Sequence, residues 1–164
     1  MTKPFRFLGG VGLLVLATLG AHAQTQATLG TSPYTETFDN LAGGLPAGFN
    51  LYTGASATKL GTSPTAAQVI LTPGTTTAWN STATGFKNFT SATGLLATTS
   101  VADQTAAPNR ALGLRQSASF GDGTSATGAG AAFAFQIDNT TGKTDFELSF
   151  QLQSLDNSVG RTTT

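Results

Sequence analysis

Strict alternation of apolar and polar side chains near the C-terminus constrains the fold more than any other part of the sequence. From Phe146 to Gln153, phenylalanine or leucine occupies every second position, and a polar residue occupies each position between. A period of two places all the apolar side chains on one face of a β-strand. We therefore expect a half-buried antiparallel strand here, with Leu148 facing the core and Gln151 facing solvent.

The rest of the sequence favours further strands over long helices. Residues 110–116 and 131–137 carry apolar side chains at alternate positions, and the loop 138–145 predicts a hairpin leading into the strand at 146–153. Thr, Ser, Gly and Ala dominate the composition, which suits strands and turns. We expect an all-β fold. Shorter strand candidates lie at residues 34–38, 49–52, 68–71 and 85–90.

The first 23 residues have the three parts of an export signal. Lys3 and Arg6 are followed by an apolar stretch at residues 8–20, and Ala21-His22-Ala23 is a small-x-small cleavage site. The apolar stretch is shorter than the roughly 20 residues that cross a bilayer as a helix. We therefore expect cleavage between Ala23 and Gln24, a secreted or cell-surface protein, and no membrane span in the mature chain.

Cleavage at this site removes the side chain on which many enzymes depend. His22 is the only histidine, and the chain has no cysteine, so Ser-His-Asp, Cys-His and His-ligated zinc sites are excluded from the mature chain. A glycosidase needs two carboxylates beside the scissile bond, but most acidic residues lie in candidate turns, which favour Asp. We expect no enzyme, with no catalytic, cofactor-binding or metal-binding residue and no cofactor.

The charge of the mature chain excludes another class of partner. After residue 23 there are six Lys and Arg residues against eight Asp and Glu residues, a formal net charge of −2. The basic residues form no cluster, so the electrostatic footprint of a nucleic-acid-binding protein is absent. We expect no nucleic-acid partner.

Two carboxylates are candidate ligands for a structural calcium ion. Glu36 and Asp39 lie at the first candidate strand, and oxygen-only ligands suit Ca²⁺ in a chain without His or Cys. The alternative is an exposed Glu on a strand followed by an Asp-Asn turn.

Three aromatic residues are candidates for sugar binding, because flat rings stack on the apolar faces of sugars; they are Trp79, Tyr34 and Tyr52. The alternative is that they anchor the core or the loops. Asn-x-Ser/Thr sequons occur by chance in a chain this rich in Ser and Thr, so they predict no glycosylation; they begin at Asn80, Asn88 and Asn139.

Several segments together resemble a known kind of module. They are residues 34–39, 45–49, 109–116, 119–122, 131–137, 146–156 and 161–164. The combination resembles a β-sandwich module found in secreted and surface proteins of Bacteroidota, commonly those exported by the type IX system. The resemblance implies an antiparallel, jelly-roll or lectin-like sandwich within a multidomain adhesin, glycan-binding protein or hydrolase. Two departures are a longer stretch at 123–130 and the absence of closing strands and a sorting domain after Thr164.

These observations lead to one expected organisation. Residues 1–23 are the signal peptide, residues 24–32 are a flexible N-terminal segment, and residues 33–164 are a jelly-roll-like β-sandwich module that lacks its last strands. We expect a non-catalytic extracellular or cell-surface module for adhesion or glycan binding, with glycans or surface polymers as partners. The alternatives are an ancillary domain of a secreted hydrolase or nuclease whose catalytic part lies beyond residue 164, and a structural spacer.

Overall fold

The computed structural model describes residues 25–30, 33–117, 120–121 and 130–155, and short strands make up most of the regular secondary structure in this part of the chain. Within it, no helix is long and apolar enough to cross a membrane. The all-β expectation is confirmed at this level. The strands are β1 (Phe49–Ala55), β2 (Val69–Ile70), β3 (Gly85–Thr90), β4 (Arg110–Arg115) and β5 (Gly130–Phe135), with the helix α1 (Val101–Ala106) and the 3₁₀ turns η1 (Leu41–Gly43), η2 (Ala66–Gln68) and η3 (Thr75–Thr77).

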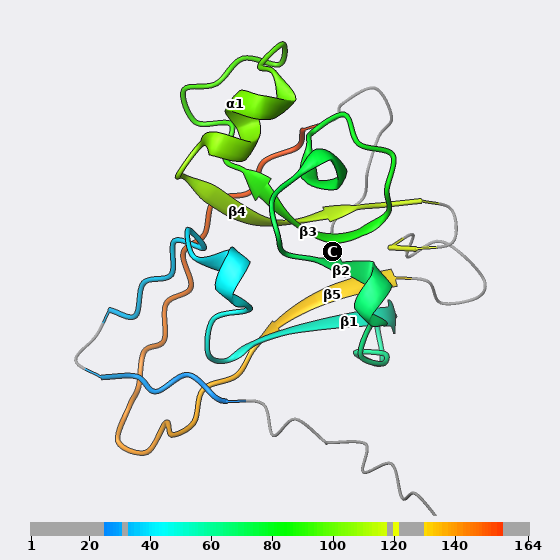
Figure 1. The fold of residues 1–164 in the computed structure, drawn as a ribbon. Coiled ribbons are helices and arrows are strands. Elements are labelled where there is room, and N and C mark those ends of the chain that lie inside the picture. The colour runs from blue at the N-terminus through cyan, green and yellow to red at the C-terminus, as the bar shows by residue number, and fades with distance from the viewer. Residues whose placement is uncertain (1–24, 31–32, 118–119, 122–129, 156–164) are drawn as a thin grey trace, which may run out of the picture.

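The strands form two small sheets (Figure 1). In one sheet, β1 pairs antiparallel with β5, and Leu51 lies opposite Phe133. In the other, β3 lies between β2 and β4. Strands β3 and β4 are antiparallel, but β2 and β3 run parallel, which differs from the expected antiparallel pairing. A parallel pair needs a long crossover, and residues 71–84, which include η3, provide it.

Both sheets contribute side chains to one hydrophobic core. Leu51 of β1, Phe86 of β3 and Phe120 form its buried centre. The ring of Phe86 meets the rings of Phe120 and Phe133 edge to face, with centroids 5.5 and 5.4 Å apart, a geometry that aromatic pairs favour. Leu114 of β4 packs against the same cluster, as the alternation at residues 110–116 predicts.

Strand β3 is buried on both faces, so it lacks the alternation of a half-exposed strand. On the face away from Phe86, the ring of Phe89 lies on Gly113 of β4, so close that an added Cβ would stand 2.3 Å from it. Lys87 is fully buried, and its Nζ donates a hydrogen bond of 2.6 Å to the carbonyl oxygen of Thr76 in η3. Burial, and secondarily the charge of Arg115, lower the pKa of Lys87.

Part of the N-terminal segment that we expected to be flexible is held in place. Ala27 is 1% exposed, its N–H donates to the carbonyl oxygen of Gln136, and its own carbonyl oxygen accepts the N–H of Asp138. Gly48 has φ +84°, and a Cβ there would come within 3 Å of Gln136 and Ala27. Hydrogen bonds and close packing therefore anchor the chain at Ala27. The expected signal peptide and its expected cleavage site lie outside the described residues.

The alternating segment 146–153 does not form the expected strand, and the expected hairpin is absent too. Strand β5 pairs with β1 instead of with this segment, which runs as an irregular trace outside both sheets (Figure 1). Positive φ angles at Gly142 and Asp145 turn the chain before it begins. Leu148 is 80% exposed, so the prediction that it faces the core is wrong.

The remaining strand predictions have mixed outcomes. Residues 49–52, 68–71, 85–90, 110–116 and 131–137 fall on the five strands. Residues 34–38 do not form a strand, because the chain turns there: Glu36 Oε1 accepts the N–H of Phe38, whose φ is +64°, and η1 follows. Residues 161–164, the last segment on which the resemblance rests, lie outside the described residues.

Candidate functional site

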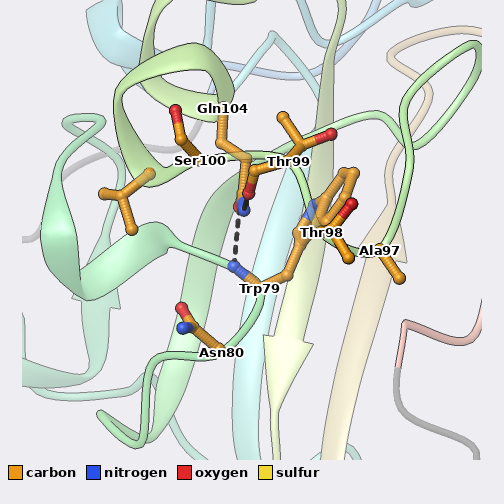
Figure 2. Close-up of a pocket in the computed structure, with 8 residues that line it drawn as sticks. Trp79, Asn80, Ala97, Thr98, Thr99, Ser100 and Gln104 are labelled. Carbon is orange, nitrogen blue, oxygen red and sulfur yellow. Dashed lines mark hydrogen bonds between the residues drawn. The ribbon is translucent and has the colours of Figure 1, made fainter.

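A pocket opens where the chain after η3 meets the segment that leads into α1 (Figure 2). Its volume is about 320 Å³, at the lower end of the range for sites that hold small molecules. Two stretches of chain form its walls, residues 79–80 and residues 97–104. The lining residues are Trp79, Asn80, Ala97, Thr98, Thr99, Ser100, Val101 and Gln104.

Gln104 of α1 joins the two walls. Its side chain is 5% exposed, and Oε1 accepts the backbone N–H of Trp79 at 2.8 Å, the bond drawn in Figure 2. Its Nε2 donates to the carbonyl oxygen of Thr99, also at 2.8 Å. The oxygen and the nitrogen of the Gln104 amide are therefore both hydrogen-bonded. These two bonds hold the walls of the pocket together in the absence of a ligand.

The indole of Trp79 is held by the strand behind it. Its Nε1 donates a hydrogen bond of 3.0 Å to the carbonyl oxygen of Thr90, the last residue of β3. The side chain is only half-buried. Because the indole N–H is already bonded, the ring offers a ligand its apolar surface.

Two polar side chains of the lining remain available to a ligand. The hydroxyl of Thr99 accepts the N–H of Leu96, and the hydroxyl of Ser100 both accepts from and donates to Asp103 at the start of α1. The amide of Asn80 and the hydroxyl of Thr98 are exposed and form no hydrogen bond within the described part of the chain.

Arg110, at the start of β4, holds the backbone of Gln104 from the protein interior. It is 6% exposed, and its guanidinium donates to Asn88 and to the carbonyl oxygens of Gln104 and Ala107. Burial lowers its pKa. Because these bonds occupy the guanidinium inside the protein, Arg110 positions Gln104 and does not reach a ligand.

The candidate calcium ligands have other roles. Asp39 Oδ1 accepts the backbone N–H of Arg110 at 2.8 Å, and Glu36 accepts that of Phe38. The bond from Arg110, and secondarily one from Thr37, lower the pKa of Asp39. In the part of the chain that the structure describes, no three His, Cys, Asp or Glu residues gather as a metal site. The Asp-Asn turn of the alternative is present at residues 39–40, but Glu36 does not lie on a strand.

The three aromatic candidates for sugar binding are not brought together. Tyr34 packs against Phe135 with ring centroids 5.1 Å apart, Tyr52 lies on β1, and of the three Trp79 lines the pocket. The three Asn-x-Ser/Thr sequons also differ in exposure. Asn80 is exposed at the pocket and Asn139 is exposed elsewhere.

The third sequon begins at Asn88, which is 1% exposed and therefore closed to modification in the folded protein. Its amide donates to the carbonyl oxygen of Leu71 and accepts from Arg110.

Sequence reasoning missed Thr98 and Gln104 as parts of the site. Ser100 and Asp103 have the Ser-x-x-Asp spacing that commonly begins a helix, and this signal would have located α1. It would not have shown that Gln104 faces Trp79, since that contact joins residues 25 positions apart.

Comparison with known proteins adds no relative: no protein-family model matches this sequence, and neither a curated protein nor a solved structure is detectably similar to it.

Proposed function

We propose that this chain is a non-catalytic, extracellular β-sandwich module that binds glycans and so contributes to adhesion. The observation that carries the proposal is the pocket at Trp79. It combines a fixed indole surface with an available amide on Asn80 and an available hydroxyl on Thr98. A sugar has apolar C–H faces that stack on an aromatic ring and hydroxyls that need donors and acceptors, so it matches both parts.

Further features support the architecture in this proposal. Apolar faces of both sheets meet in one core around Leu51 and Phe86, as the layers of a sandwich do. Two segments on which the resemblance to Bacteroidota surface modules rests overlap strands: 109–116 contains β4, and 131–137 covers all of β5 except Gly130. The export signal at residues 1–23 supports an extracellular location.

The absence of catalysis is also part of the proposal. His22, the only histidine, precedes the predicted cleavage site, and the sequence has no cysteine. Glu36 and Asp39 use their carboxylates to hold backbone N–H groups. These facts support a binding module over a hydrolase.

Titration calorimetry against the glycans selected by an array tests the proposal. We expect Trp79→Ala and Asn80→Ala each to weaken binding at least tenfold, because one removes the stacking surface and the other a hydrogen-bonding group. Asn80 is exposed, so its variant keeps the fold if Trp79→Ala does not. The aromatic control is Tyr34→Ala, away from the pocket, which should bind as the parent does. Binding that neither pocket variant weakens would overturn the proposal, as would a protein that binds no glycan.

A further inference from the structure

We infer that the pocket at Trp79 selects uncharged sugars and disfavours acidic ones, such as uronic acids and sulfated sugars. This inference rests on the proposed function, because it assumes that the ligand is a glycan. It adds the chemical class of that ligand, which the charges in and around the pocket determine.

The lining itself contains no charge. All eight residues of the walls are neutral, from the indole of Trp79 to the amide of Gln104. A carboxylate or sulfate that leaves water for such a site needs a cation or several donors to replace its hydration. The groups that form no hydrogen bond in the described part of the chain are the amide of Asn80 and the hydroxyl of Thr98. With the O–H of Thr99, whose oxygen already accepts the N–H of Leu96, they are neutral groups that suit the hydroxyls of a sugar better than an anion.

The buried cations close to this region in the fold are already engaged. Arg110 lies behind Gln104, and its guanidinium donates to backbone and amide oxygens on the protein side. Lys87 is fully buried and donates to the carbonyl oxygen of Thr76. Neither residue lines the pocket, so neither balances the charge of an acidic ligand.

A negative charge lies beside the lining on the solvent side. Asp103 is exposed in the first turn of α1, and its Oδ2 lies 2.7 Å from the hydroxyl of Ser100, which lines the pocket. The same hydroxyl accepts the backbone N–H of Asp103. The first turn of α1 thus has its own acceptor and its own carboxylate, which opposes any attraction of its N–H groups for an anion. An acidic sugar in the pocket is repelled by Asp103.

Two ligands of nearly the same shape but different charge separate the effect of charge on binding from the effect of shape. The probes are a neutral gluco-oligosaccharide and the same oligosaccharide with its C6 hydroxymethyl groups oxidised to carboxylates. We expect the neutral probe to bind at least tenfold more tightly at low salt, and we expect added salt to narrow the difference, because it screens the repulsion. Asp103→Asn should strengthen binding of the acidic probe severalfold and leave that of the neutral probe unchanged. Asp138→Asn, which removes an exposed carboxylate outside the lining, is the matched control and should change neither.

The outcomes distinguish this inference from the proposed function. Equal or tighter binding of the acidic probe overturns the inference and leaves glycan binding intact. An acidic probe that gains nothing from Asp103→Asn overturns the role given to that carboxylate. If the protein binds neither probe and no glycan on the array, the proposed function itself fails.

Discussion

Replacing Gly113 by alanine tests how β3 and β4 pack on the face away from the core. Gly113 lies opposite Lys87 in the sheet, and the ring of Phe89 crosses it. The backbone of Gly113 is not in the left-handed region, so the substitution acts through space and not through strain in φ.

The size of the effect follows from the contact. A Cβ on Gly113 would stand 2.3 Å from Cδ2 and 2.9 Å from Cε2 of Phe89, whose side chain is buried. The ring has to move, and overpacking of this kind costs about 1–3 kcal/mol of unfolding free energy. A loss of 1 kcal/mol lowers the melting temperature by roughly 3–5 °C in a domain of this size.

Urea unfolding followed by circular dichroism measures the loss. The control is Gly74→Ala, at an extended glycine where a Cβ meets nothing within 4 Å, and it should leave stability unchanged or raise it by about 0.4–1 kcal/mol. The double variant Gly113→Ala/Phe89→Leu should be more stable than the sum of its single changes predicts, since the smaller side chain vacates the space.

Two results would show that Phe89 does not pack on Gly113. Gly113→Ala with the stability of the parent would show that Phe89 does not lie on β4 as described. Strict additivity in the double variant would show that the two residues are not in contact.

Two further predictions concern the alternating segment and the turn before η1. Leu148→Asp should leave the midpoint of urea unfolding unchanged, because Leu148 is largely exposed. Leu51→Asp should unfold the protein, because it places an unpaired charge in the core. A Leu148→Asp variant that is unfolded would support the buried strand expected from the sequence and contradict the structure. The folded protein lowers the pKa of Asp39, so its ionised form stabilises the fold above the unfolded-state pKa of about 4, and this contribution disappears as the pH falls through the folded value. Asp39→Asn should therefore be less stable than the parent at pH 7, with the difference shrinking below about pH 4, and a difference that does not depend on pH would exclude this role.

The strands were predictable where one face is buried and local pairing suffices. Leu112 and Leu114 alternate in sequence, and both pack against the core. Strand β3 was harder to recognise because Lys87 and Asn88 are buried there, and only distant residues, Thr76 and Arg110, make that burial tolerable. Polar residues in a buried strand are predicted to be exposed when their hydrogen-bond partners are distant in sequence.

The alternation at residues 146–153 misled for a related reason. Periodicity reports which faces a strand would have, but not whether a sheet edge lies beside it. Here β5 pairs with β1, across about 80 residues of sequence, and leaves Leu148 in solvent. The pocket was equally hard to predict, because Gln104 and Trp79 meet only through the tertiary fold. The residue type of Trp79 made it a candidate for sugar stacking, with anchoring of the core or a loop as the alternative.

The fluorescence of Trp79 provides the most direct test of the central claim, that this pocket binds a glycan. Trp79 is the only tryptophan in the sequence, so its emission reports on the pocket without other signals. Titration with a neutral oligosaccharide selected by the array should shift or quench the emission along a saturable curve, and the midpoint should match the calorimetric affinity. A glycan that binds by calorimetry and leaves the emission of Trp79 unchanged would place the binding site elsewhere and contradict this account.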